Sequence, residues 1–244
     1  MSETLRTSGQ VSLAVAASRV LGVVRESTFA ALFGGGALAD AYQVAFRIPN
    51  LLRDLFAEGA LSSAFVPTFT AVLEKDGEDA ALALARLVST AILLVTGALT
   101  LAGIVWAEPL VWLISAGFGD DVAKAQLAVE LTRLMMPFLA FVSLGAVWMG
   151  MLNARRRWLA PAWAPAVFNL VNIAAGFWLV AAGLDERTAL WWWSLATLGS
   201  ALVQTLVQVP ALWRLGWRPG IRWEHFKPAW CKCARRHPAD VVRI

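Results

Sequence analysis

The stretch SRVLGVVRESTFAALFGGG, residues 18–36, decides the class of fold. It is apolar enough to enter a membrane, yet it carries Arg19, Arg25 and Glu26. Ionised side chains in a membrane-spanning helix are costly, and they usually face the protein interior or a water-filled cavity. The stretch therefore predicts a transmembrane helix whose charged face has a function.

The composition of the whole chain supports a membrane protein. Of the 244 residues, 59% are hydrophobic and 16% are charged, and the mean hydropathy is +0.62. Soluble domains have about 45–50% apolar and about 25% charged residues. The net charge of +4 comes from basic residues that cluster between apolar segments. This pattern favours an orientation signal, so we expect no nucleic acid partner.

Six apolar segments have about the 20 residues that a spanning helix needs. Pro49 and Pro67 are expected to bend the second segment and Pro137 the fourth, and the glycines at 34–36 predict a turn. The sequence thus predicts an all-α, polytopic helical membrane protein with about six transmembrane helices. The segments are 11–33, 38–72, 84–106, 124–152, 160–182 and 188–213.

The charges of the loops predict the orientation. Segments 73–86, 153–158 and 214–227 are rich in lysine and arginine, whereas the alternate loops are poor in them. The positive-inside rule therefore predicts a cytoplasmic N-terminus, followed by an uncleaved first helix. Tryptophans support the same topology because indole rings favour membrane interfaces. They are Trp106, Trp112 and Trp191–Trp193 at the outer ends, and Trp158, Trp213 and Trp217 at the inner ends.

Residues 223–244 differ in character from the preceding lobe, residues 1–222. They have no helical periodicity and hold both cysteines and both histidines of the chain. The spacing of His225, Cys231, Cys233 and His237 matches no established zinc pattern, so we expect no metal. We interpret this segment as a tail that is disordered or out of frame.

The second apolar segment carries a further set of charges. Asp40, Arg47, Asp54 and Glu58 recur at spacings of seven, seven and four, which places them on one face of a helix, with Arg53 to one side. Such charges can pair between helices or reach the membrane surface. A set this dense favours a water-filled cleft. Because arginine presents a planar fork to phosphate oxygens, the cleft suits a phosphorylated or acidic ligand.

The remaining polar residues point to structural roles. Asn169 and Asn172, and likewise Gln204 and Gln208, are predicted to form hydrogen bonds between helices. Glu130 and Arg133 are expected to pair within their helix, and the arginines at 155–157 to anchor the topology and touch anionic lipid headgroups. The chain has no Gly-rich phosphate loop and no nucleophile–base pair, so we expect neither an enzyme nor a cofactor.

Three stretches resemble the MurJ/MviN family of lipid II flippases, which belongs to the MOP exporter superfamily. They are SRVLGVVRE (18–26), FGGGALADAYQVAFRIPNLLRDLFAEGALSSAFVP (33–67) and GMLNARRRWLAPAWAPAVFN (150–169). The resemblance implies a multi-pass protein of the bacterial inner membrane that moves lipid II, the lipid-linked peptidoglycan precursor, between leaflets. Family members have two lobes around a cationic cavity that opens alternately to each side.

The resemblance also implies roles for individual residues. Arg19, Arg25 and Arg53 match the arginines that engage pyrophosphate and headgroup, and Asp40 and Glu58 match acidic positions needed for transport. Glu26 stands where the family often has aspartate. Asp54 stands where many relatives have a basic residue, and it is expected either to lower the positive potential of the cavity or to pair with Arg47 or Arg53.

The resemblance implies that the chain holds about six of the family's fourteen spans, those of the N-terminal lobe. A truncation or frameshift explains both the missing lobe and the odd tail better than a natural half-size transporter, so we do not expect the chain to be a competent flippase alone. The missing C-terminal lobe, or self-association, would complete it. Two alternatives stay open: another exporter of the superfamily, for drugs or polysaccharide-linked lipids, and a non-transport membrane scaffold.

Overall fold

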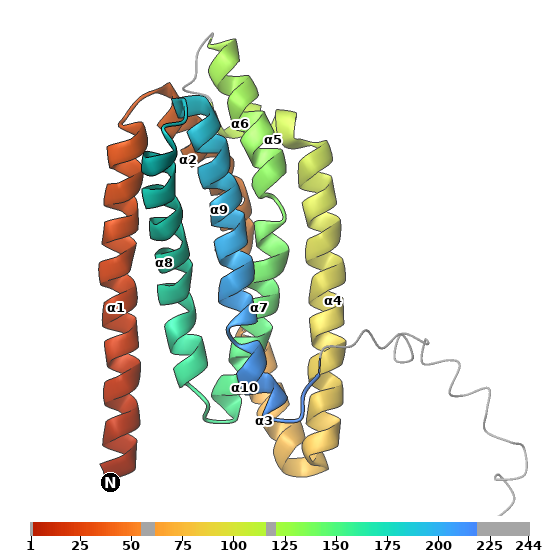
Figure 1. Ribbon diagram of the computed structural model, residues 1–244. Helices are drawn as coiled ribbons and strands as arrows, with labels where there is room; N and C mark the ends of the chain where they lie inside the picture. The colour runs from red at the N-terminus through yellow and green to blue at the C-terminus, as the bar shows by residue number, and fades with distance from the viewer. Residues whose placement is uncertain (1, 55–61, 116–120, 219–244) are drawn as a thin grey trace, which may run out of the picture.

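The computed structural model describes residues 2–54, 62–115 and 121–218, and all regular structure within these ranges is helical. The helices run mostly side by side along one axis (Figure 1). They are α1 (Ser2–Phe33), α2 (Ala37–Arg53), α3 (Ser62–Asp76), α4 (Glu78–Val105), α5 (Ala107–Ile114), α6 (Val122–Met135), α7 (Phe138–Ala154), α8 (Leu159–Ala182), α9 (Glu186–Leu206) and α10 (Val209–Trp213).

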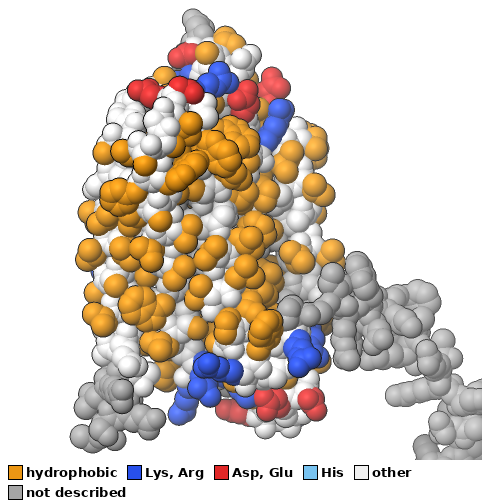
Figure 2. Space-filling model, in the orientation of Figure 1, with side chains coloured by type: hydrophobic (Ala, Val, Ile, Leu, Met, Phe, Trp, Pro, Cys, Tyr) orange, Lys and Arg blue, Asp and Glu red, His pale blue; other side chains and the backbone are white. Residues whose placement is uncertain are grey.

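Five segments of the described chain are long and apolar enough to cross a membrane. They are Thr7–Phe33, Glu78–Val105, Val122–Ala154, Leu159–Ala182 and Glu186–Trp213. Figure 2 shows the matching surface, with hydrophobic side chains across the middle and charged side chains gathered at the two ends. The chain is therefore a multi-pass membrane protein, as the sequence predicted.

The second predicted span, 38–72, is divided between two shorter helices. α2 ends at Arg53 and α3 begins at Ser62, so the helix ends lie between Pro49 and Pro67 rather than at either proline. α2 packs against α6 and α9, whereas α3 packs against α4 and α7 at the opposite end of the bundle. Neither α2, with 17 residues, nor α3, with 15 residues, is among the five segments long and apolar enough to cross a membrane.

Two other spans are interrupted. α6 ends at Met135 and α7 begins at Phe138, so the bend predicted at Pro137 is confirmed. The last predicted span was expected to be continuous, but α9 ends at Leu206 and α10 begins at Val209. Leu206 lies four residues before Pro210, and a proline ring clashes with the carbonyl of the fourth residue before it.

Two of the tryptophans predicted for the membrane interface are core residues instead. Trp193 is 2% exposed and packs on the rings of Phe29 and Phe33, and Trp217 is 1% exposed and meets the ring of Trp148 edge-on. Trp106, Trp112, Trp158, Trp191, Trp192 and Trp213 are exposed near the ends of their helices, as expected. Tryptophan is large and apolar, so it serves either role.

α1 stands at one edge of the bundle and packs mainly on α8 (Figure 1). Small residues allow the two helices to approach closely: Gly22 of α1 faces Asn169, and Gly176 of α8 faces Thr28. Small residues at such contacts are typical of membrane helices, because backbone proximity replaces the hydrophobic driving force. This packing holds Arg25 of α1 toward the interior of the bundle.

Candidate functional site

A first cavity of about 550 Å³ lies where α1, α2 and α9 meet. Four charged side chains predicted from the sequence line it: Arg25, Glu26, Asp40 and Arg47. Its apolar wall includes Phe29 and Trp193. Two members of the predicted charge face, Asp40 and Arg47, therefore line a cavity together with α1.

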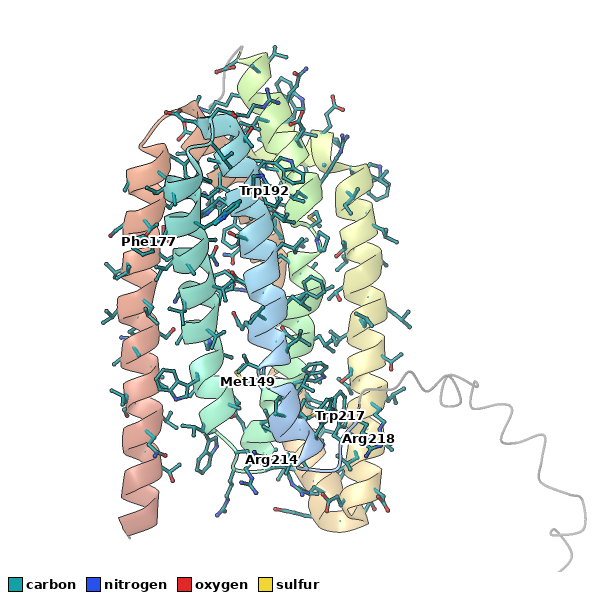
Figure 3. All side chains as sticks on the ribbon, viewed as in Figure 1. Met149, Phe177, Trp192, Arg214, Trp217 and Arg218 are labelled. Carbon is teal, nitrogen blue, oxygen red and sulfur yellow. The ribbon has the colours of Figure 1, made fainter. Side chains whose placement is uncertain are left out.

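A second cavity of about 500 Å³ continues from the first. Arg25, Phe46 and Asn50 line both, so these three residues mark the junction. Arg53 lines the second cavity, as does Met149, which Figure 3 labels in the half of the bundle away from the α1–α2 turn. The two cavities thus follow one another along the bundle.

The arginines lie at different depths along this route. Arg25 lies eight residues before Phe33, the end of α1, and Arg53 lies 16 residues after Ala37, the start of α2. At about 1.5 Å of rise per residue, these positions are about 12 Å and about 24 Å from the turn that joins the helices. A cation is therefore available at successive levels within the apolar band.

Each of these arginines has an acidic neighbour in the sequence as an ion-pair partner. Arg25 pairs with Glu26, and its guanidinium also lies over the ring of Phe168, 5.5 Å from the centroid. Arg53 Nη2 donates to Asp54 Oδ1 at 2.6 Å, which confirms one of the two partners expected for Asp54. Such pairs lower the cost of holding the empty cations at membrane depth.

Asp40 is held by a residue far away in the sequence. Lys124 Nζ at the start of α6 donates to Asp40 Oδ2 at 2.6 Å, so the pair ties α6 to the first turn of α2. Asp40 also lines the first cavity. The sequence analysis missed Lys124 because nothing local relates two residues 84 positions apart.

Two of the predicted site residues that the structure describes do not line the cavities. Arg19 of α1 and Asp54, directly after α2, are both exposed and line neither cavity, and Glu58 lies outside the described residues. Arg47 lines the first cavity and is itself exposed. Asn50 was missed, although its spacing of three from both Arg47 and Arg53 places it on the same face of α2.

Hydrogen bonds between helices confirm the roles predicted for three of the four amides. Asn169 Nδ2 donates to the carbonyl of Ser18 at 3.0 Å, and Asn172 Oδ1 accepts from Thr197 Oγ1 at 3.0 Å. Gln208 Nε2 donates to the carbonyl of Gly145 at 3.2 Å. The sequence analysis did not foresee that Asn169, Gln204 and Gln208 also line the second cavity.

The pairing expected within the fourth span is wrong. Glu130 Oε2 accepts from Arg187 Nη2 at 3.2 Å, so the bond joins α6 to the start of α9 rather than to Arg133. A spacing of three permits contact within a helix, but Arg187 approaches from the neighbouring helix. The zinc-like set His225, Cys231, Cys233 and His237 lies outside the described residues.

Comparison with known proteins identifies the family of this chain. The family model described as lipid II flippase MurJ matches residues 29–237. The chain belongs to this family. The matched range runs past residue 222, where the sequence analysis placed the end of the lobe, and it reaches into residues that the structure does not describe.

Individual relatives agree with the family match. The chain is 38% identical over 217 residues to the probable lipid II flippase MurJ of Rhizobium tropici, which covers 86% of this chain and 40% of the relative. It is 37% identical over 227 residues to the lipid II flippase MurJ of Burkholderia cenocepacia, which covers 93% of this chain and 42% of the relative. The chain therefore spans about two fifths of the length of these relatives.

A solved structure confirms the fold. The structure of lipid II flippase MurJ in the inward closed conformation superposes with a TM-score of 0.70 at 27% sequence identity. The match covers 88% of this chain and 44% of that protein. The family, the helical membrane fold and the partial coverage that the sequence analysis predicted are thus all confirmed.

Proposed function

We propose that this chain is the N-terminal lobe of a lipid II flippase in the bacterial inner membrane. In this proposal the lobe holds the phosphorylated headgroup of lipid II while the lipid tail stays in the bilayer. Translocation proceeds by alternating access, with no bond made or broken. The observation that carries the proposal is the pair of adjoining cavities, which meet at Arg25 in a chain of the MurJ family.

Arg25 and Arg53 are the proposed pyrophosphate ligands. Arginine stays charged at membrane depth and can bind two phosphate oxygens at once, which gives it both affinity and orientation. Glu26 and Asp54 occupy these arginines in the empty state. When pyrophosphate arrives, the guanidinium groups exchange a carboxylate for a phosphate, so each of the two arginines has an anionic partner both before and after binding.

Arg47 and Asp40 are proposed to support transport from the first cavity. Arg47 adds a cation between the levels of Arg25 and Arg53, and Asp40 connects the cavity to α6 through Lys124. Arg19 and Glu58, which the family resemblance suggested, stay predictions. The proposed lobe needs a second lobe to enclose the headgroup, supplied by the rest of a longer protein or by self-association.

The orientation is part of the proposal. The end of the bundle that holds the N-terminus and the α7–α8 turn is placed in the cytoplasm because that turn carries three consecutive arginines. Cysteines introduced at Gly35 and at Arg156, each into a chain whose own Cys231 and Cys233 are replaced by serine, test this placement. A membrane-impermeant thiol reagent should label only Gly35→Cys in intact spheroplasts, and labelling of only Arg156→Cys would reverse the topology.

Binding of undecaprenyl pyrophosphate tests the ligand role directly. The full chain, purified into phosphatidylcholine nanodiscs, should bind this lipid, and Arg25→Ala and Arg53→Ala should each weaken binding at least about tenfold, since hydrogen bonds to charged groups contribute about 1.5–3 kcal/mol. Arg214→Ala is the matched control, because Arg214 is exposed and lines neither cavity. Equal affinity in all four proteins would refute the assignment.

Transport is tested in a chimera that supplies the second lobe. The matched N-terminal part of the Burkholderia cenocepacia flippase is replaced by this chain, and the chimera is expressed in cells depleted of their own flippase. The chimera should sustain growth and lipid II translocation, whereas the Arg25→Ala chimera should not. Normal translocation with Arg25→Ala would sink the proposed mechanism.

A further inference from the structure

The second cavity differs from the first in the chemistry of its polar groups. The first cavity is lined by two cations and two carboxylates. The second has Arg25 and Arg53 as its charged residues, and its other strong polar groups are the carboxamides of Asn50, Asn169, Gln204 and Gln208. Asn50, Asn169 and Gln204 come from α2, α8 and α9, and Gln208 comes from the turn between α9 and α10, so the amides lie on more than one side of the space.

Two of the amides are fixed by the fold and two are free. Asn169 and Gln208 each use one N–H to bind a main-chain carbonyl of a neighbouring helix. The side chains of Asn50 and Gln204 form no hydrogen bond with any other residue in the described parts of the chain. Both are partly exposed, so both can offer a donor and an acceptor to a ligand.

Gln208 adds an unused acceptor. Its Nε2 must face the Gly145 carbonyl, because the flipped amide would place two oxygens together. The remaining atom, Oε1, is buried and has no partner among the described residues, in a side chain that is 3% exposed. Buried acceptors are normally satisfied, so Oε1 needs a donor that the described residues do not supply, which can be a water or a ligand group once the side chain moves slightly.

The arrangement defines the chemistry of a complementary group. A secondary amide carries one N–H donor and one C=O acceptor on opposite edges, so it can bridge carboxamides that lie on different sides of a cavity. The two arginines lie at the junction and along the edge of the same space, where they would hold a phosphate attached to that group. The volume of about 500 Å³ falls within the range of small-molecule sites.

We infer that the second cavity is a subsite for a secondary amide carried next to the pyrophosphate of the ligand, with Asn50 and Gln204 as the specificity-determining residues. The amide is either an acetamido group on the sugar or a peptide bond of the headgroup. The inference rests on the proposed function, because it takes the ligand to be a pyrophosphate-linked lipid. The subsite would explain why the cavity prefers a lipid with an amide-bearing headgroup to undecaprenyl pyrophosphate alone.

Three lipids with an increasing number of amide groups test the inference on the full chain in phosphatidylcholine nanodiscs. Undecaprenyl pyrophosphate has no amide, undecaprenyl-pyrophosphoryl-N-acetylglucosamine has the acetamido group alone, and lipid II has both acetamido groups and a peptide. One amide hydrogen bond changes affinity by about two- to tenfold. The wild-type chain should therefore bind an amide-bearing lipid about tenfold more tightly than undecaprenyl pyrophosphate.

The variants Asn50→Leu and Gln204→Leu remove the free amides while keeping similar volume. Each should cut the preference for amide-bearing lipid by about two- to tenfold and leave the affinity for undecaprenyl pyrophosphate unchanged. Gln43→Leu is the matched control, because Gln43 lines the first cavity and not the second. A preference seen already with the N-acetylglucosamine lipid assigns the acetamido group of the first sugar, and one seen only with lipid II assigns the peptide or the second acetamido group.

The outcomes separate this inference from the proposed function. If the wild type binds all three lipids equally, or if both variants keep its preference, the amide subsite is wrong while pyrophosphate binding stands. The inference would also be overturned if Gln204→Leu weakened the binding of all three lipids equally, since that pattern indicates general damage to the cavity. If the wild type does not bind undecaprenyl pyrophosphate and Arg25→Ala changes nothing, both proposals fail.

Discussion

The close contact between α1 and α8 predicts that a single methyl group will separate them. In Gly176→Ala the added Cβ would overlap Thr28 Cγ2 of α1 and lie 3.1 Å from Trp193 Cζ3. Thr28 cannot easily turn away, because β-branched side chains are stiff and its hydroxyl donates to the carbonyl of Val24 at 2.8 Å. The strain must therefore move α1.

The expected magnitude follows from a comparison with Gly22→Ala on the other side of the same interface. The new Cβ there would lie 3.5 Å from Asn169 Nδ2, an ordinary contact. Both variants gain about 1 kcal/mol from the higher helix propensity of alanine. Only Gly176→Ala adds the cost of overpacking, about 1–3 kcal/mol, so the two variants should differ by about that amount in the free energy of unfolding.

Unfolding of the purified chain in mixed detergent micelles measures this difference, with circular dichroism as the signal. A third variant isolates the clash: Gly176→Ala combined with Thr28→Ser removes Cγ2 and keeps the hydroxyl. It should recover most of the lost stability, and the double-mutant cycle should give a clear coupling energy. If Gly176→Ala proves as stable as Gly22→Ala, or if Thr28→Ser gives no recovery, the tight α1–α8 packing is refuted.

Three further contacts give predictions of smaller effect. Lys124→Asp should loosen the junction of α6 with α2, and Asp40→Lys in the same chain should restore thermal stability if the pair is real; an exposed pair contributes at most about 1 kcal/mol. Tyr42→Phe removes the hydrogen bond to Thr197 and should lower the free energy of unfolding by about 1 kcal/mol, measured in the same detergent assay. The carboxylate of Asp185 accepts hydrogen bonds at the start of α9, which lowers its pKa below the ordinary 3.8. Its stabilising effect is complete above that value and fades as the pH falls below it, so Asp185→Asn should flatten the acid limb of a stability–pH profile, and an unchanged limb would contradict this.

The positions of helices and turns were predictable wherever a single sequence pattern was strong. The apolar runs predicted the membrane-spanning segments because burying backbone in lipid demands about 20 apolar residues per helix. The glycine turn was equally clear: Gly34 adopts a φ of 60°, which residues with a Cβ rarely adopt. The division of the second span was not predictable, because no local signal other than two prolines marks it, and the helix ends coincide with neither.

The site was predictable in its charge and not in its geometry. The separation of seven residues between Asp40 and Arg47 correctly predicted that both lie on the cavity face of α2. Arg19 lies in a similar sequence setting to Arg25, yet it is exposed and lines neither cavity, since the rotation of α1 depends on its packing against α8. The partner of Asp40 and the second role of Gln204 depend on tertiary neighbours, which periodicity does not specify.

The dependence of α1 on α8 has a consequence for biogenesis. α1 ends at Phe33 and α8 begins at Leu159, so 125 residues, 34–158, are synthesised between them. At about 5–20 residues per second, α1 waits about 6–25 s in the bilayer before its main neighbour emerges. A lone arginine at the bilayer centre costs about 2.5–3.5 kcal/mol on insertion scales. Because Arg25 carries its counter-ion in the adjacent Glu26, the first helix enters the membrane with that charge already neutralised by its own sequence.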